Sequence, residues 1–313
     1  MNKFSSLQIE YLQSRNLHDF FENFSHYVWE RLKFHAENPM LSTLRETTLN
    51  ENLFDGLIAL MDKPLNLRLF HAKEERVNGN DFEIFVEISP NDFIYFPGQV
   101  KKIYLNGEYE AISHPVGKYD KREQILNLID YAKGKGLPIY SFFNYSKDDF
   151  NFSDNNYVKE LFGCTVIDAF YIKEKYFDAN KNKIKPVYFK NIHPPANPFI
   201  AILDLINSRF PNSLKRVFPT IENLPVIKHY TKEQLVTNGL WIEINPSKDE
   251  KSGMFVGTSQ LEELCNAEHK IYNSDFLPRY RLLLTIDDIQ ERKLNYSKKI
   301  NIIQNEQPNF SRN

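Results

Sequence analysis

The sequence contains few of the residues on which several classes of protein depend. Its 313 residues include only two cysteines, Cys164 and Cys265, and their placement matches neither a zinc-ligand pattern nor a disulfide framework. No uncharged stretch is long enough to cross a bilayer, and the first residues lack the apolar run of a signal peptide. We therefore expect a soluble cytoplasmic protein with two buried thiols in a reducing compartment.

Charge and motifs exclude further classes. The formal net charge of −2 argues against a protein that coats nucleic acid by charge alone, because such proteins are usually basic throughout. The sequence has no glycine-rich phosphate loop, no Gly-x-Ser-x-Gly elbow and no His-Glu-x-x-His helix, so NTPase, esterase and zinc-protease functions have no support. His193 stands before two prolines in a rigid turn, where a lone histidine is more often structural than catalytic.

Helical patterns occupy the first part of the sequence. Apolar residues recur at helical spacing from residue 6 to about residue 36, with a break near Asn16. Thr48 and Glu51 have the spacing of a capping box, which predicts the start of another helix. Glu46 would stand just before that start.

Strand patterns follow. Runs at residues 65–71, 81–88 and 94–104 have the composition of β-strands. Next we expect a helix that is opened by Asp120 and Glu123 and ended by Gly134 and Gly136. The later elements are a strand at 138–145, a short helix at 157–162 and a strand at 164–172. This order predicts an α/β fold whose crossovers are right-handed.

The chain beyond residue 172 has weaker patterns. We expect a lysine-rich loop at 173–190, a helix at 198–210 and a hairpin formed by 241–244 and 254–256. The predicted domain organisation is a helical segment over residues 1–40, a core over 41–172, an α+β extension over 173–300 and a disordered tail over 301–313.

Four polar residues have the spacing of a phosphodiesterase site. Asp81 and Glu83 are two residues apart on one predicted strand, and Gln99 and Lys101 repeat this spacing on the next, so each pair shares a face of the sheet. Phosphodiester hydrolysis commonly uses a divalent cation, and Mg²⁺ prefers oxygen ligands. The Lys101 ammonium could offset charge in the transition state. The alternative for the two carboxylates is a half-exposed strand in contact with solvent.

These motifs together resemble a known superfamily. Gly79-Asn80-Asp81-Phe82-Glu83, Gln99-Val100-Lys101 and Gln124-Ile125 are similar to the PD-(D/E)XK restriction-endonuclease-like nucleases. The similarity is to the branch with Q-x-K in place of E-x-K, which includes Mrr-type restriction enzymes and phage-defence effector nucleases. The resemblance covers residues 41–172. It implies an αβββαβ core and a Mg²⁺-dependent endonuclease, with Mn²⁺ as an alternative cofactor, acting in anti-phage defence or restriction.

The resemblance also implies roles for individual residues. The metal ligands would be Asp81, Gln99, the Val100 carbonyl, Glu46 and Glu83, and Lys101 would be the catalytic lysine. Gln99 replaces an acidic residue, so the site has one negative charge fewer than the family pattern, and Glu83 would restore it. If it does not, metal affinity would be weak. The second hypothesis is then a degenerate nuclease fold that binds nucleic acid or a protein without cutting.

The same interpretation predicts the substrate and the binding partners. We expect nucleic acid as substrate, DNA rather than RNA, with no membrane contact, and the resemblance leaves open a homodimer or a partner protein of a defence system. Candidate contacts to nucleic acid are Gln124, Lys102, Lys173 and Lys175. Gln124 could instead be an exposed first residue of its helix, and the lysines from 173 onward could belong to a solvated loop. A third hypothesis assigns the activity to the chain after residue 173.

Overall fold

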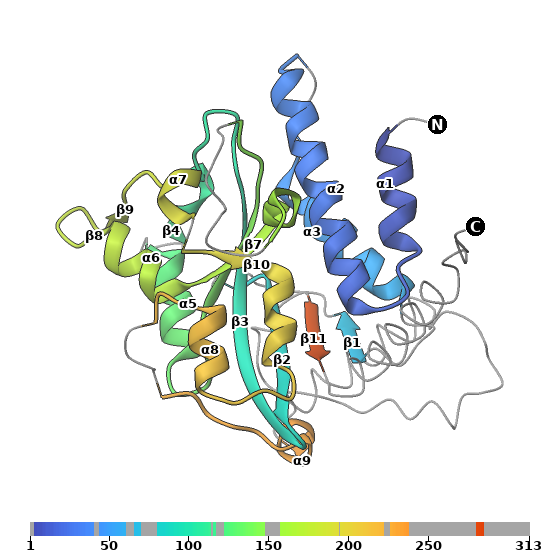
Figure 1. Ribbon diagram of the computed structural model, residues 1–313. Coiled ribbons are helices and arrows are strands. Elements are labelled where there is room, and N and C mark those ends of the chain that lie inside the picture. Colours follow the sequence, from blue (N-terminus) through green and yellow to red (C-terminus); the bar gives the residue numbers. More distant parts are fainter. Residues whose placement is uncertain are drawn as a thin grey trace, which may run out of the picture.

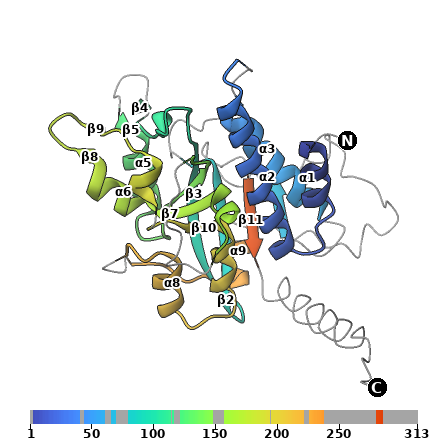
Figure 2. The same cartoon turned by 45° about the horizontal axis from the view of Figure 1, so that its top comes forward.

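The computed structural model has a mixed β-sheet with helices on both faces (Figure 1). It describes residues 3–40, 44–60, 66–69, 80–113, 115–116, 122–147, 157–193, 195–221, 226–237 and 280–284. Three N-terminal helices lie on one side of the sheet, and α5 and α6 lie on the other (Figures 1 and 2). The predicted α/β class is confirmed.

The helices α1 (Lys3–Leu12) and α2 (Leu17–Glu37) are separated at the predicted break. The Asn16 side chain accepts a hydrogen bond from the Asp19 amide at 2.8 Å, which satisfies one of the free amides at the start of α2. The predicted capping box is wrong. Helix α3 (Glu46–Ala59) begins at Glu46, so Thr48 and Glu51 lie inside it. Glu46 contacts the end of strand β3, an interaction between distant segments that local spacing does not reveal.

The main sheet has seven strands in the order β1-β11-β2-β3-β6-β7-β10. Their bounds are β1 Asn66–Leu69, β2 Phe82–Ser89, β3 Asp92–Lys102, β6 Ile139–Phe143, β7 Cys164–Asp168, β10 Asn197–Pro198 and β11 Tyr280–Leu284. β2 and β3 form an antiparallel hairpin, and α5 (Gln124–Ala132) connects β3 to the parallel strand β6. β11 pairs in parallel with β2, so the main sheet also contains strands from beyond residue 173.

Several elements after β6 differ from the prediction. The strand expected at 164–172 ends at Asp168, whose side chain accepts from the Tyr171 amide at 2.8 Å and caps α6 (Ala169–Tyr176). A short apolar run does not distinguish strand from helix, which explains the error. The loop expected at 173–190 is also wrong, because the chain there is ordered into elements. These are the end of α6, the hairpin of β8 (Phe177–Asp178) and β9 (Lys183–Ile184), and the start of α7 (Phe189–Ile192).

The remaining elements are short. The helix expected at 198–210 is the 3₁₀ helix η3 (Phe199–Leu205), and the one expected at 157–162 is the 3₁₀ helix η2 (Lys159–Gly163). The others are η1 (Glu110–Ile112), β4 (Pro115–Val116), β5 (Arg122–Glu123), α8 (Asn212–Val217) and α9 (Lys232–Thr237). The hairpin predicted at 241–244 and 254–256, the predicted tail and Cys265 lie outside the described residues. No helix in the described ranges is long and apolar enough to span a membrane.

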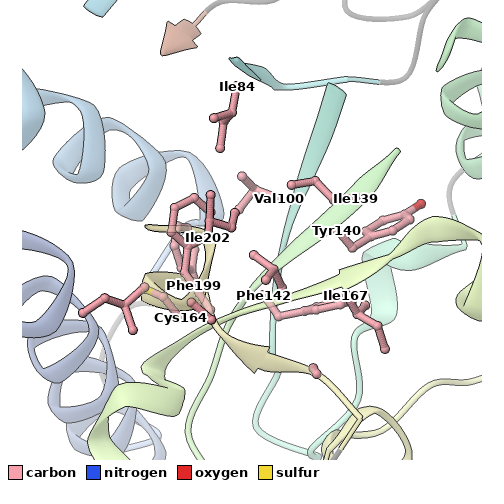
Figure 3. Packing of buried hydrophobic residues seen from close by; sticks show 14 of the residues in the cluster. Ile84, Val100, Ile139, Tyr140, Phe142, Cys164, Ile167, Phe199 and Ile202 are labelled. Carbon is pink, nitrogen blue, oxygen red and sulfur yellow. The ribbon is translucent and has the colours of Figure 1, made fainter. Parts of the chain in front are cut away.

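Side-chain packing in the core determines how β2 and β3 pair next to the candidate site. Ile84, Val100 and Ile202 lie in one apolar cluster on the face of the sheet that η3 covers, whereas Tyr140 points to the opposite side (Figure 3). Gly98 pairs with Phe82, and a Cβ atom built on Gly98 would lie 2.1 Å from the Phe82 ring. This ring therefore occupies the space of a side chain at residue 98, and only glycine allows the close approach.

A buried polar network connects β6, β7 and α7. The Tyr109 hydroxyl donates to Asn144 Oδ1 at 2.6 Å, and Asn144 Nδ2 donates to Thr165 Oγ1 at 2.8 Å. His193 Nδ1 donates to the Phe189 carbonyl at 3.0 Å, because a carbonyl can only accept, and in the neutral ring Nε2 then accepts from Thr165 Oγ1 at 3.1 Å. Burial lowers the pKa of His193 to about 3. The structural role predicted for this histidine is thus supported by its contacts.

We expect His193 to make the protein sensitive to acid. The unfolded state takes up a proton on this residue from about pH 6.5 downward, whereas the folded state does so only near pH 3. The unfolded state therefore binds more protons over this interval, and the free energy of unfolding should fall by about 1.4 kcal/mol per pH unit. Urea unfolding of the wild type and of His193→Gln at several pH values measures the difference. Equal slopes for both proteins would contradict the prediction.

Candidate active site

The candidate site lies where β3 extends beyond its partner. Strand β2 begins at Phe82, which pairs with Gly98, so residues 99–102 of β3 have no partner in β2. Two carboxylates occupy this free edge. Asp81 Oδ2 accepts a hydrogen bond from the Val100 amide at 2.8 Å, and Glu46 Oε2 accepts one from the Lys102 amide at 2.9 Å. Asp81 and Glu46, which are 35 positions apart in the sequence, are thereby held beside alternate residues of one strand.

The Val100 carbonyl is directed to the same edge. The N–H and C=O of one residue in a β-strand point to the same side, and the Val100 N–H points to Asp81. Two residues along a strand span roughly 7 Å, so this carbonyl lies between the positions of the two carboxylates. Hence the edge presents carboxylate and carbonyl oxygens side by side.

Lys101 brings a positive charge to this edge. Its side chain is almost fully buried, and its Nζ lies 4.0 Å from Glu46 Oε1. Glu46 therefore contacts the backbone of β3 through one oxygen and approaches the lysine with the other. Such a contact fixes the position of the ammonium group, which in a buried environment acts on nearby charge more strongly than it would in water.

Gln99 is buried, and its side-chain amide has no bonding partner in the part of the chain that the structure describes. The residue is 0% exposed, and neither Oε1 nor Nε2 has a hydrogen-bond partner among the described residues. The same holds for the Tyr140 hydroxyl, which belongs to the residue opposite Gln99 in the ladder of β3 and β6, and for Gln124 Oε1 at the start of α5. Buried polar atoms are normally satisfied, so several unsatisfied ones in one region indicate a place built for an ion, water or ligand.

Tyr140 and Glu123 were missed as site residues by the sequence analysis. Burial raises the pKa of Tyr140 well above its usual value, and the negative charges of Asp81, Glu123 and Glu46 raise it further. The phenol therefore stays protonated, and its hydroxyl remains able to donate a hydrogen bond. Glu123 is buried at the end of β5, where its Oε1 accepts from Ser113 at 3.1 Å. No spacing in the sequence indicates these neighbours, because they come from segments that are far apart in the chain.

Glu83 lies in a cluster of tyrosines. Its carboxylate is fully buried, and Oε1 accepts hydrogen bonds from the hydroxyls of Tyr95 at 2.5 Å and Tyr131 at 2.8 Å, and from Asn80 Nδ2 at 3.2 Å. The pKa of Tyr95 is raised well above its ordinary value by burial and by the Glu83 charge. The structure thus places Glu83 Oε1 against α5 and β3, and the role of this residue as a metal ligand stays a prediction.

The predicted nucleic-acid contacts lie in different places. Gln124 is buried at the first position of α5, so its interpretation as an exposed helix residue is wrong. Lys102 is next to Glu46, and burial lowers its pKa. Lys173 and Lys175 are exposed in the last turn of α6, where Lys175 Nζ is 3.4 Å from Glu174.

The residues at the edge of β3 fit a hard divalent cation. Asp81, the Gln99 amide oxygen and the Val100 carbonyl are oxygen donors, and Mg²⁺ typically takes one or two carboxylates and keeps several waters. The unsatisfied Gln99 amide is the observation that favours such an ion. Within the described ranges, no group of three His, Cys, Asp or Glu residues is placed to hold a metal. A cation here would therefore depend on the amide and carbonyl oxygens.

Comparison with known proteins identifies a family. A family model described as a family of unknown function (DUF6615) matches residues 17–306, which is most of the chain. No curated protein and no solved structure matches the sequence.

We expect Gln99→Met to stabilise the metal-free protein. The substitution removes two unsatisfied buried polar atoms at nearly constant volume, so the free energy of unfolding should rise by about 1–2 kcal/mol. Urea unfolding in a chelating buffer measures this change. Binding of Mn²⁺ to the same variant, measured by calorimetry, should be weaker than in the wild type. A variant that is less stable than the wild type would show that Gln99 makes favourable contacts with protein.

Proposed function

We propose that this chain, which belongs to the DUF6615 family, is a metal-dependent nuclease with a restriction-endonuclease-like core. The observation that carries the proposal is the buried, unsatisfied Gln99 amide beside an edge on which alternate amides of β3 hold Asp81 and Glu46. Lys101 lies at the same edge. A metal site with an adjacent buried lysine is an arrangement suited to hydrolysis of a phosphodiester bond.

The order of elements supports the proposed fold. Apart from the short elements η1, β4 and β5 between β3 and α5, the chain runs α3, β1, β2, β3, α5 and β6, with β2 and β3 antiparallel and β3 and β6 parallel. This is the αβββαβ order that the resemblance implies. One feature goes beyond that order: β11 lies between β1 and β2. This strand is on the far side of β2 from β3, so it leaves the edge that carries the carboxylates unchanged.

Each residue of the site would have a separate role in phosphodiester hydrolysis. A bound divalent cation would neutralise charge on the scissile phosphate and lower the pKa of the attacking water. Asp81, Gln99 and the Val100 carbonyl would hold it, and Glu46 fixes Lys101. The Lys101 ammonium would then offset the negative charge that develops in the transition state.

Tyr140 and Glu123 add to this site. The Tyr140 hydroxyl stays protonated and can donate a hydrogen bond to a phosphate oxygen or to water. Glu123 supplies a negative charge near Tyr140, which partly offsets the acid lost where Gln99 replaces a carboxylate. A role in anti-phage defence or restriction rests on the resemblance alone, as does dimerisation.

A second candidate is a binding module that uses the same fold without cutting. It is favoured by the neutral Gln99 and by the absence of a three-residue His, Cys, Asp or Glu cluster from the part of the chain that the structure describes. Such a protein would retain affinity for nucleic acid but would bind neither Mg²⁺ nor Mn²⁺ at Asp81.

Two variants test the nuclease. Asp81→Asn removes the carboxylate but keeps the size of the side chain, and Lys101→Met removes the charge of the buried lysine. Each should reduce Mg²⁺- or Mn²⁺-dependent cleavage at least about 100-fold, since an electrostatic contribution to a transition state has this magnitude. Cleavage of labelled single-stranded and duplex DNA and RNA is the measurement. Circular dichroism checks that both variants fold.

Matched control variants remove a carboxylate and an ammonium group at the C-terminal end of α5. Asp130→Asn and Lys133→Met change exposed residues there and should cleave at the wild-type rate. Gln99→Glu should raise the affinity for Mn²⁺ because it adds a negative charge to the site. Undiminished cleavage by both site variants would overturn the proposal. Nucleic-acid binding by a wild-type chain that binds no metal would select the binding module.

A further inference from the structure

A groove next to the candidate site has both positive charge and aromatic surface. Its volume is about 700 Å³, and its walls come from the end of α2, the loop after β3, the segment after β6 and the start of α7. The charged and aromatic lining residues on which the inference rests are Lys102, Lys147, Lys190, Tyr104, Tyr145 and Tyr188. We call this surface the Lys–Tyr groove.

Positive charge dominates the groove. Its three lysines face one acidic lining residue, Glu110, which also accepts a hydrogen bond from Asn106 at 3.0 Å. Lys147 and Lys190 are exposed, and neither has an ion pair with a described residue. A concave surface with low-dielectric walls concentrates the field of such charges and attracts anions.

The aromatic side chains are placed to contact a planar group. Tyr188 is exposed, and Leu105, which lines the same groove, is 62% exposed. Lys102 Nζ lies 4.5 Å from the centre of the Tyr104 ring, and Tyr145 packs edge-on against Trp29 at 5.3 Å. Lysines beside tyrosines, of which Tyr188 is exposed, suit a ligand that carries both phosphates and flat bases. An acidic peptide would satisfy the lysines but leave the rings without a partner.

The backbone fixes the walls in place. The loop after β3 turns at Gly107, whose φ of 78° is a left-handed conformation, and Gly107 N donates to the Tyr104 carbonyl at 2.9 Å. The same loop is tied to the start of α7, because Tyr109 N donates to the Val187 carbonyl at 2.9 Å and Phe189 N donates to the Gly107 carbonyl at 3.1 Å. A preformed groove loses little conformational entropy when it binds.

The groove and the candidate site share a border. The Lys102 side chain lines the groove, while its backbone amide donates to Glu46 of the site. We propose that the Lys–Tyr groove binds a short unpaired stretch of the polynucleotide, with phosphates at the lysines and bases against the tyrosines, and so leads single-stranded substrate to the Asp81 site. The volume is that of a small-ligand pocket, which admits a few nucleotides of single strand but not a duplex. This inference rests on the proposed nuclease function.

Binding in the absence of divalent cations tests the groove separately from cleavage. The wild-type chain in EDTA should bind fluorescent single-stranded DNA or RNA of about twelve nucleotides more tightly than the corresponding duplex, as measured by anisotropy. Tyr188→Ala should weaken single-strand binding about tenfold, whereas Tyr188→Phe keeps the ring and should bind as the wild type does. Tyr188 is exposed, so neither change threatens the fold.

The contribution of the groove lysines can be measured from the salt dependence of binding. Lys147→Ala with Lys190→Ala should make the plot of log affinity against log salt concentration shallower by roughly 0.7 per lysine. The matched control is Lys133→Ala with Lys215→Ala, which removes two exposed lysines that lie outside the groove and outside the predicted nucleic-acid contacts, and it should leave the slope unchanged.

Two results would overturn the inference: groove variants that bind single strands as the wild type does, or a duplex that binds as tightly as the single strand. The outcome is independent of the proposed activity. Groove-dependent binding by a chain that cleaves nothing with Mg²⁺ or Mn²⁺ would keep the groove and reject the nuclease. Groove variants that still cleave duplex substrate at the wild-type rate would keep the nuclease and reject the groove.

Discussion

The candidate site depends on two hydrogen bonds from the backbone of β3 to carboxylates outside that strand. The Val100 amide donates to Asp81 and the Lys102 amide donates to Glu46, both where β2 no longer covers the edge of β3. A free strand edge normally exposes unpaired N–H groups. Here two of those groups bind carboxylates, so the geometry of β3 sets the positions of Asp81, Glu46 and, through Glu46, Lys101.

The unsatisfied polar groups around this edge share one physical explanation. Burying a polar atom without a partner costs free energy, and folding tolerates that cost most readily where function requires it. Gln99, Tyr140 and Gln124 carry such atoms in neighbouring elements, while Glu83 two strand positions from Asp81 is satisfied by tyrosine hydroxyls. Two polar regions on one face of β2 and β3 thus differ in character. The polar atoms around Glu83 hydrogen-bond to one another. Those around Gln99 include donors and acceptors that can still bind a ligand.

The Lys–Tyr groove extends this arrangement beyond the site. Lys102 belongs to both features, since its amide binds Glu46 and its side chain lines the groove. The net charge of the chain is −2, so the positive surface is local. Local charge is sufficient for a protein that holds a substrate strand in one place, whereas a protein that coats nucleic acid needs it throughout.

Patterns in the sequence were sufficient to predict the α/β class, the order of the main helices and strands from α3 to β6 without the short η1, β4 and β5, and the break near Asn16. These follow from periodicity and local hydrogen bonding, which act between near neighbours. It also indicated Asp81, Gln99 and Lys101, because residues two apart on a strand share a face.

The other features depend on contacts that form only in the folded chain. The insertion of β11 beside β2, the contact of Glu46 with β3, the tyrosine cluster around Glu83 and the walls of the Lys–Tyr groove all join segments that are distant in the sequence. Tyr131 and Glu83, for example, are 48 positions apart. The same holds for the start of α3, where a contact with the end of β3 prevailed over the local capping pattern at Thr48. Spacing along one segment contains no information about which distant segment will pack against it.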